Sequence, residues 1–184
     1  MRKRIVFILA IVAAAVLLLT SCNELLIEET PAAWNNEASV SDAEHNDFIK
    51  TEIVKVIDGD TVKVYLNGKK TTVRIIGINT PESVHPDESL NTEEGKIASD
   101  YVKKLLPVGT TVYIEYDLSN KDQYDRTLAY LWLDDNVNTG NYNDFCKYNV
   151  SAIIMQNTYC EAVYYRPNKK YYDWLLKLEE EYQR

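Results

Sequence analysis

Short runs of alternating apolar and polar residues dominate the chain after residue 50. Residues 61–66 place apolar side chains at every second position, which is typical of a half-buried strand. Residues 53–57 and 71–78 are β-branched runs on either side of it. Asn67-Gly68 separates the second run from the third, and this dipeptide favours a type I′ turn because both central residues need positive φ. The stretch therefore predicts a three-stranded meander.

Two later runs, residues 110–117 and 127–133, alternate in the same way and predict two further strands. Residues 134–147 are rich in Asn, Gly and Asp and predict a loop. Residues 159–165 form an extended aromatic segment.

Helical spacing of apolar residues appears in three places. The first follows Asn91 or Thr92 as the N-cap and ends before Pro107. Its predicted core stripe consists of Ile97, Tyr101, Val102, Leu105 and Leu106. Residues 148–157 predict a short helix, and residues 169–184 predict a final amphipathic helix.

The N-terminus has the pattern of a targeting segment. Basic residues 2–4 precede an apolar run, residues 5–19, that is short for a membrane span. The run ends in Leu-Thr-Ser-Cys, which resembles the lipobox of bacterial lipoproteins. The resemblance implies cleavage of residues 1–21, lipidation of Cys22, and an extracytoplasmic protein anchored in the lipid bilayer of a bacterial membrane. An uncleaved anchor helix and an ordinary signal peptide are the alternatives.

Charge divides the remainder into two parts. Residues 22–50 carry seven acidic residues and one lysine, a composition typical of a flexible tether. Residues 51–184 carry 21 acidic and 16 basic residues, and their length suits one domain with its own core; we expect a monomer. Because nucleic-acid binding rests on Lys and Arg neutralising phosphates, a net charge of −5 favours a transient catalyst over a tight binder.

Candidate chemistry gathers at the ends of the first three strands. Asp58 and Asp60 flank a glycine, Arg74 lies in the third strand, and Asn79 and Glu82 follow it. Carboxylate and amide oxygens suit Ca²⁺, a carboxylate can act as general base toward water, and a guanidinium suits phosphate. From spacing alone, a plain Asp-Gly turn and a solvated arginine remain an equal alternative.

The segments IDGDTV, VRIIGI, NTPE and DQYDRTLAY, in this order across residues 51–184, resemble the staphylococcal nuclease family. The resemblance implies an α+β fold, a five-stranded OB-like β-barrel with about three helices. It also implies Ca²⁺-dependent cleavage of DNA and RNA phosphodiesters, with single-stranded or locally unpaired strands as partners.

The same resemblance assigns roles to matching positions. It implies metal ligands at Asp60, Asn79 and Thr80, a general base at Glu82, phosphate contacts at Arg74 and Arg126, and nucleotide contacts at Tyr124 and Tyr165. The sequence departs from the family at three of its positions: Asn79 replaces an aspartate, Asp125 a glycine and Val163 a tyrosine. We expect Asn79 to weaken metal binding, and Asp125 to pair with Arg126 and blunt it.

Two further expectations concern geometry. A two-residue turn at Asn67-Gly68 pairs Thr61 with Arg74, which puts Asp60 on the opposite face unless the strand bulges near Gly59. Two cysteines remain besides Cys22, and outside the cytoplasm such a pair favours a disulfide, Cys146–Cys160, with two free thiols as the alternative.

These observations predict a membrane-anchored extracytoplasmic nuclease that uses a Ca²⁺-type metal. The first alternative is a binding module on the same barrel, with catalysis lost through Asn79 and Asp125. The second is an envelope lipoprotein with a structural role.

Overall fold

The computed structural model describes residues 46–183. The predicted signal peptide, Cys22 and most of the predicted tether lie outside this range. The first strand begins at Ile49, two residues before the predicted domain start. Phe48 stacks on Trp132 with ring centroids 5.9 Å apart. The aromatic residue at the end of the predicted tether is therefore part of the core packing.

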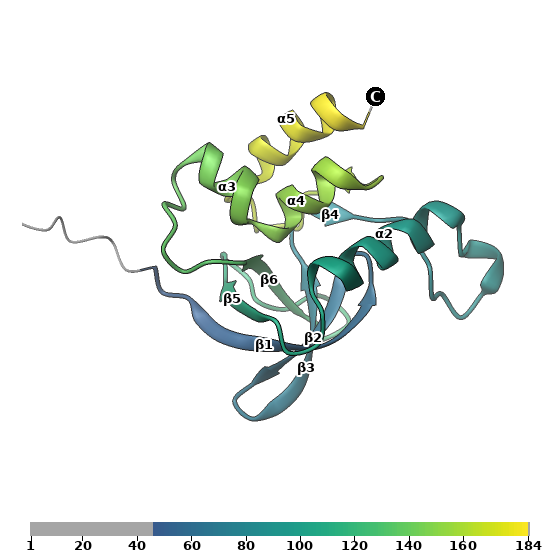
Figure 1. Ribbon diagram of the computed structural model, residues 1–184, viewed down its shortest axis with the longest axis horizontal. Helices are drawn as coiled ribbons and strands as arrows, with labels where there is room; N and C mark the ends of the chain where they lie inside the picture. The colour runs from purple at the N-terminus through teal and green to yellow at the C-terminus, as the bar shows by residue number, and fades with distance from the viewer. Residues whose placement is uncertain (1–45, 184) are drawn as a thin grey trace, which may run out of the picture. The chain divides into compact units, whose positions relative to one another are not determined.

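Five strands close into a barrel in the order β1-β2-β3-β6-β5 (Figure 1). The strands are β1 (Ile49–Asp58), β2 (Thr61–Leu66), β3 (Lys69–Ile75), β5 (Thr111–Glu115) and β6 (Thr127–Trp132). Only the β3–β6 pair is parallel in the barrel. Apolar residues at alternate positions fill the interior, so the predicted OB-like α+β fold is confirmed.

The β2–β3 hairpin has the predicted register. Asn67 (φ 50°) and Gly68 (φ 74°) occupy the left-handed region that a type I′ turn needs. Leu66 pairs with Lys69, and Thr61 pairs with Arg74. The register between β1 and β2 shifts at the carboxyl end of β1. From Val56 to Asp58 the chain advances two residues on β1, while the paired β2 residues, Val62 and Thr61, are only one residue apart. This bulge next to Gly59 is the local distortion that the sequence required.

The third predicted strand is divided. β3 ends at Ile75, Gly77 takes φ 90°, and a separate strand β4 (Ile78–Asn79) pairs with β7 (Glu161–Ala162) outside the barrel. A Cβ on Gly77 would lie 2.3 Å from Leu175 Cδ1. The glycine therefore lets the chain leave the barrel against a helix.

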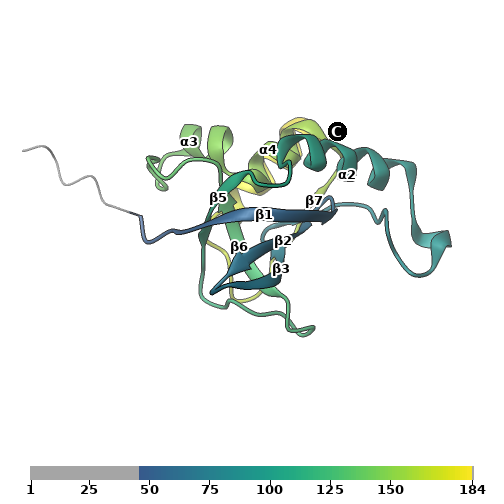
Figure 2. The same ribbon diagram turned by 60° about the horizontal axis from the view of Figure 1, so that its bottom comes forward.

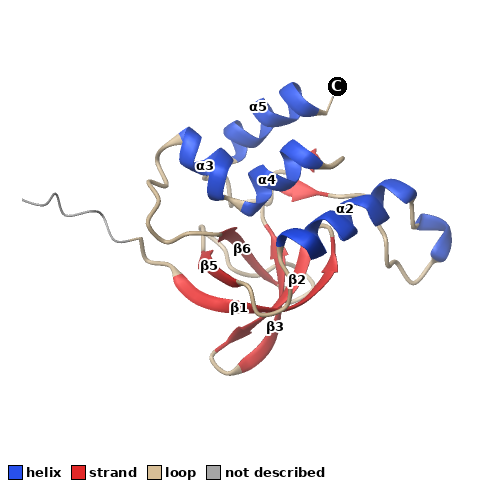
Figure 3. Cartoon of the chain, in the orientation of Figure 1, coloured by secondary structure: helices blue, strands red, loops and turns tan. Residues whose placement is uncertain are grey.

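Helices pack on one side of the barrel, as Figure 2 shows. They are α2 (Glu93–Leu105), α3 (Tyr142–Tyr148), α4 (Val150–Asn157) and α5 (Tyr172–Tyr182), with a 3₁₀ turn η1 (Glu88–Leu90) before them (Figure 3). The residues described thus form four α-helices instead of the expected three. Within residues 46–183, none of the helices has the length and apolar character needed to cross a bilayer.

Residues 134–141 form the predicted loop, but helix α3 occupies residues 142–147 of the same stretch, and there the loop prediction is wrong. The Asn141 side chain accepts hydrogen bonds from the backbone N–H groups of Asn143 and Asp144, so the Asn-rich stretch caps a helix. Phe145 on the helix is fully buried and lies edge to face with Trp132. Tertiary burial of one aromatic side chain outweighs the loop-like composition.

Helix α2 begins at its predicted cap, since Thr92 Oγ1 accepts from Gly95 N at 3.0 Å. Its core stripe was predicted partly wrongly. Ile97 is 56% exposed, whereas Ala98 and Ser99 are buried beside Val102. The helix is rotated toward its small residues, which lets it approach the strand–loop junction closely.

The cysteines correct a second prediction. Cys146 and Cys160 are free thiols, so the expected disulfide is wrong. Cys160 is fully buried, with its sulfur 3.5 Å from Met155 Sδ, and burial raises its pKa to about 12. Burial also raises the pKa of Cys146. Neither thiol is a reactive thiolate.

Candidate active site

A cleft of about 260 Å³ opens at the ends of β1, β2 and β3. It is lined by Ile57, Asp58, Asp60, Thr61, Arg74, Asn79, Glu82, Val84, Arg126 and Tyr165. Six of the eight predicted catalytic, metal and substrate residues are in this set. The other two adjoin it: Thr80 through Asp60, and Tyr124 through Arg126.

Asp60 and Arg74 form a buried ion pair at the centre of the cleft. Arg74 Nη2 lies 2.7 Å from Asp60 Oδ2, and both residues are less than 10% exposed. The bulge in β1 and the turn at Gly59 bring Asp60 back to the face of Arg74. The β2–β3 register alone would put Asp60 and Arg74 on opposite faces, and the bulge explains how they still share one site.

Further hydrogen bonds fix the Arg74 guanidinium. Nη1 donates to the carbonyl oxygens of Ile78 (2.9 Å) and Ile75 (3.2 Å), and Nη2 donates to Asn79 Oδ1 (2.9 Å). Arg74 Cζ lies 5.3 Å from the ring centroid of Tyr165. A cation held from several sides presents one fixed orientation to an anionic ligand.

Thr80 is bound to Asp60 by two groups. Its backbone N–H and its Oγ1 both donate to Asp60 Oδ2, at 3.1 and 3.3 Å. A Cβ at Gly59 would lie 2.6 Å from Thr80 Oγ1, so the middle residue of Asp-Gly-Asp must be glycine for this approach. The loop after β4 is thus locked to the turn after β1.

The backbone of Glu82 is held against the start of α2. Its carbonyl oxygen accepts from Thr92 N at 2.9 Å, and a Cβ at Gly95 would lie only 2.2 Å from that oxygen. Glu82 lines the cleft. Partial desolvation and the negative charges of Asp58 and Asp60 raise its pKa, although His85 and Arg74 oppose the shift. A raised pKa suits a carboxylate that must accept a proton.

The sequence placed Asp58 among the candidate groups but assigned it no role, and the structure shows what it holds. Its carboxylate accepts from Ser83 Oγ at 2.6 Å, Ser83 N at 3.2 Å and Gly59 N at 2.8 Å. It thereby holds the residue next to Glu82. The repeated acid in Asp-Gly-Asp was the available signal, but a turn explained it equally well.

Arg126 is paired with Asp122. Asp122 Oδ2 accepts from Arg126 Nε at 2.6 Å, and Oδ1 accepts from its backbone N–H at 2.9 Å. Burial alone would raise the pKa of Asp122, but the hydrogen bonds from Arg126 and Tyr124 lower it overall. The carboxylate orients the guanidinium, which still lines the cleft.

Asp125 does not pair with Arg126 as predicted. Its carboxylate lies 3.1 Å from Lys121 Nζ at an exposed site. Asp125 has φ 59°, in the left-handed region that glycine occupies without strain. The family resemblance leads us to expect a glycine at this position, and the positive φ explains why glycine suits the backbone there.

The two predicted substrate tyrosines differ in exposure. Tyr165 is half-buried beside Arg74, and burial raises its pKa. Tyr124 is 70% exposed, with Arg126 Cζ 5.3 Å from its ring centroid. Each ring therefore accompanies one of the two arginines.

The donor atoms suit a hard cation in kind, although they are few. Asp60 offers a carboxylate and Asn79 an amide oxygen, and both oxygens accept from the same Arg74 Nη2. Within the described residues there is no cluster of three or more His, Cys, Asp or Glu of the type that holds a metal. Oxygen donors with a low charge count fit weak Ca²⁺ binding.

Comparisons with known proteins agree with this geometry. The family model "Staphylococcal nuclease homologue" matches residues 72–184. The chain is 33% identical over 182 residues to the thermonuclease of Staphylococcus hyicus, covering 99% of this chain and 95% of that protein. It is 39% identical over 119 residues to the thermonuclease of Staphylococcus intermedius, covering 65% of this chain and 62% of that protein. It is 32% identical over 136 residues to endonuclease YncB of Bacillus subtilis (strain 168), covering 73% of this chain and 58% of that protein.

Proposed function

Since this chain belongs to the staphylococcal nuclease family, we propose that it hydrolyses phosphodiester bonds of DNA and RNA with Ca²⁺ as cofactor. The observation that carries the proposal is the convergence of Asp60, Arg74, Glu82 and Arg126 on one cleft. These residues come from four separate segments of the chain, and they supply a metal-binding oxygen, a base and two phosphate-binding cations.

Glu82 is the proposed general base. Glu82 lines the cleft and its pKa is raised, so it can take the proton from a water molecule that attacks phosphorus. The backbone contact to Thr92 and the contact between Asp58 and Ser83 hold its segment on both sides. The attacking water is thus oriented by a residue with a fixed backbone.

Arg74 and Arg126 are the proposed phosphate-binding groups. Each is oriented by a carboxylate, Asp60 or Asp122, at 2.7 and 2.6 Å. Charge builds up on the oxygens of a phosphoryl group as water attacks, and preorganised donors act most strongly on such charge. Two guanidinium groups lining one cleft can contact different oxygens of the same group.

Asp60, Asn79 and the Thr80 carbonyl are the proposed ligands of Ca²⁺. When bound, the ion supplies Lewis-acid polarisation of a phosphate oxygen. Because Asp60 brings the only carboxylate of this set, we expect binding to be weak without substrate. Tyr124 and Tyr165 stand beside the two arginines and are proposed to contact the nucleotide, which favours single-stranded or locally unpaired substrates.

The proposed location is extracytoplasmic. The basic n-region, the apolar run and the terminal Leu-Thr-Ser-Cys support a lipoprotein signal, with Cys22 as the lipidated residue. We propose that the anchored protein is a monomer. An acidic tether would then separate the catalytic domain from the membrane surface.

A gel assay tests the proposal. The purified chain should cleave single-stranded DNA with Ca²⁺ and stop when a chelator is added. Glu82→Gln should lower turnover by roughly 10²–10⁴-fold, the usual contribution of a general base, with an unchanged unfolding transition. Turnover within a few-fold of the parent would remove Glu82 from the mechanism.

A binding module is the second candidate function, because Asn79 takes the place of an aspartate expected from the family. That alternative predicts strand binding without cleavage at any Ca²⁺ concentration. Arg126 argues against it, since this residue keeps a dedicated carboxylate partner at 2.6 Å.

A further inference from the structure

Positive charge is concentrated in the first three strands of an acidic protein. Residues 49–75 carry six basic and three acidic residues, whereas residues 76–184 carry 11 basic and 18 acidic residues. Two of the three acids among residues 49–75 are Asp58 and Asp60, which are buried and hydrogen-bonded in the cleft. The exposed surface of these strands is therefore basic.

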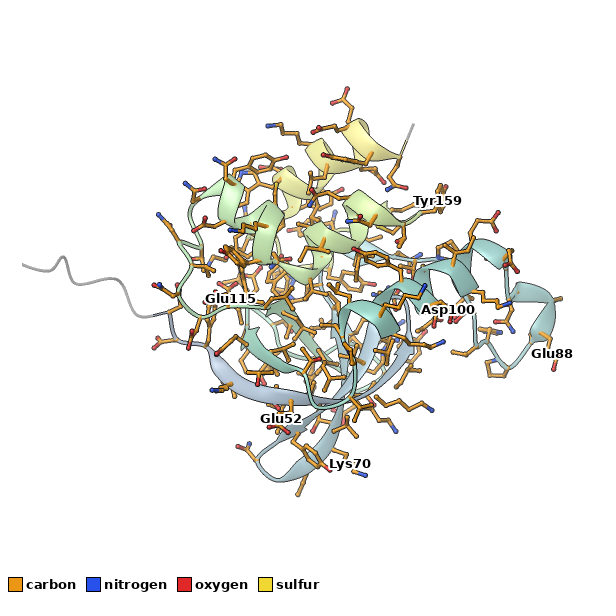
Figure 4. All side chains as sticks on the ribbon, viewed as in Figure 1. Glu52, Lys70, Glu88, Asp100, Glu115 and Tyr159 are labelled. Atoms are coloured by element: carbon orange, nitrogen blue, oxygen red, sulfur yellow. The ribbon has the colours of Figure 1, made fainter. Side chains whose placement is uncertain are left out.

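Register places the lysines on the outside of the barrel. Val62 and Val64 of β2 are fully buried, so the alternate residues Lys63 and Tyr65 point outward. Lys55 of β1 lies directly opposite Lys63, and Lys70 of β3 directly opposite Tyr65. Figure 4 shows Lys70 on the β2–β3 hairpin. We call Lys55, Lys63, Tyr65 and Lys70 the basic face.

The basic face is a destabilising arrangement without a ligand. Like charges directly opposite on neighbouring strands disfavour the sheet, and Lys55 faces Lys63. No ion pair joins Lys55, Lys63 or Lys70 to a carboxylate in the part of the chain that the structure describes. Glu52 borders the face beside Tyr65, but it too forms no ion pair there. An extended polyanion would relieve this repulsion.

The face leads directly to the cleft. Thr61 precedes Lys63 on the same side of β2, and its partner across the strands is Arg74. Thr61 and Arg74 both line the cleft. Residues two apart on a strand are about 7 Å apart, so Tyr65 stands about 13 Å from Thr61 along β2. A strand held by Arg74 would meet the basic face next.

We propose that the basic face binds the single-stranded nucleic acid on one side of the phosphate held in the cleft. Lys55, Lys63 and Lys70 contact its phosphates, and Tyr65, which is 46% exposed, stacks its ring on a base. The proposal rests on the nuclease function proposed above and extends its substrate site along β2. Register alignment with Arg74 and an exposed aromatic ring favour a nucleic acid over an anionic membrane surface.

The test uses two triple variants of the purified chain. Lys55→Gln/Lys63→Gln/Lys70→Gln alters the face, and Lys103→Gln/Lys104→Gln/Lys147→Gln removes the same charge from exposed positions on α2 and α3. The face variant should raise KM for a 20-nucleotide strand roughly tenfold, with kcat little changed and a much smaller effect on a dinucleotide. Each single-strand phosphate contact contributes about 0.7 to the slope of log affinity against log salt concentration. Loss of three contacts should therefore make this slope less steep by about 2 in the face variant. The helix variant should match the parent.

Binding of a fluorescent 20-mer to Glu82→Gln, with and without the face substitutions, separates the two proposals. If the parent cleaves nothing but this affinity still falls with the face substitutions, the nuclease function fails and the surface stands. An unchanged KM and salt slope in an active face variant would overturn the surface. The proposal would also be overturned if the face substitutions abolished binding to phosphatidylglycerol vesicles but left the affinity for the strand undiminished. The basic face would then bind a membrane.

Discussion

At the scale of single residues, the site depends on carboxylates that hold other groups as much as on those that react. Asp60 orients Arg74, Asp122 orients Arg126, and Asp58 holds Ser83 beside Glu82. All three contacts are 2.7 Å or shorter. Carboxylates thus orient the two arginines and the segment of Glu82, and, besides desolvation, the charges of Asp58 and Asp60 also raise the pKa of Glu82.

Asp58→Asn tests this second effect. The charge of Asp58 is one cause of the raised pKa of Glu82, after desolvation. A general base works only when deprotonated, so kcat/KM should rise with pH through the pKa of Glu82 in the free enzyme. Removing the charge of Asp58 lowers that pKa, so the acid limb should move to lower pH. The measurement is a pH profile of kcat/KM.

Ser83→Ala is the matched control for Asp58→Asn. It removes the hydrogen bond from Ser83 Oγ to Asp58 but no charge. It should lower the rate at all pH values without moving the acid limb. An acid limb that stays in place in Asp58→Asn would leave Asp58 with a positioning role only.

Asn79→Asp tests the metal site. The Asn79 amide oxygen already lies 2.9 Å from Arg74 Nη2, so a carboxylate there would keep this partner and add negative charge beside Asp60. A hydrogen bond to a charged group is worth about 1.5–3 kcal/mol, which corresponds to roughly 10- to 150-fold in affinity. The Ca²⁺ midpoint of the cleavage rate should fall by that factor.

Asn79→Ala should shift the Ca²⁺ midpoint the other way. An unchanged midpoint in both variants would place the metal elsewhere. Insensitivity of the parent to chelator would have the same meaning.

The sequence predicted which residues belong to the site better than it predicted their contacts. Glu82, Arg74 and Asp60 stand out because their types and order match a family pattern. The role of Asp58 depends on a hydrogen bond to a residue 25 positions away, and no local pattern contains that information. The same holds for Asp122, which we passed over in favour of Asp125, the neighbour in sequence.

At the scale of elements, α2 supports the loop that carries the proposed base, Glu82. Its buried face consists of Gly95, Ala98, Ser99 and Val102, which are small enough to let its first turn contact the backbone at Glu82. Strand periodicity and the Asn67-Gly68 turn predicted the meander well, because local sterics determine them. Rotation of α2, burial of Phe145 in α3 and separation of the two thiols depend on packing between distant segments, so the sequence left them undetermined.

Gly95→Ala should show the importance of this contact. Alanine normally stabilises a helix by about 1 kcal/mol relative to glycine. Here the added Cβ would lie 2.2 Å from the Glu82 carbonyl oxygen, so we expect destabilisation by roughly 1–3 kcal/mol, as in overpacked cores, and reduced kcat. Urea unfolding and steady-state kinetics measure the two effects.

Ser99→Ala on the same helix is the control for Gly95→Ala. The buried Ser99 Oγ has no hydrogen-bond partner within the residues described, so its removal should leave stability equal or higher. A Gly95→Ala variant that is stabilised as ordinary helix propensity predicts would contradict the close contact.

At the scale of the whole molecule, charge is distributed unevenly. The first three strands are basic, the rest of the domain is acidic, and residues 22–50 are more acidic still. A net negative protein should bind a nucleic acid only where its cations converge, and in this chain they converge at the cleft and the basic face. Net charge in the sequence suggested a weak binder, but only the strand register shows where the cations gather.

The proposed lipidation of Cys22 can be tested through membrane attachment. If residues 1–21 are a lipoprotein signal, nuclease activity should sediment with membranes and be released by detergent, because covalent acyl chains hold a protein at a bilayer. Cys22→Ala should move the activity to the soluble fraction with kcat per molecule unchanged, since the cleft residues lie between Ile57 and Tyr165. Cys146→Ala, at a half-buried free thiol, is the matched control and should stay with the membrane. Membrane activity that persists in Cys22→Ala would favour an uncleaved anchor helix, and a soluble parent protein would favour an ordinary signal peptide.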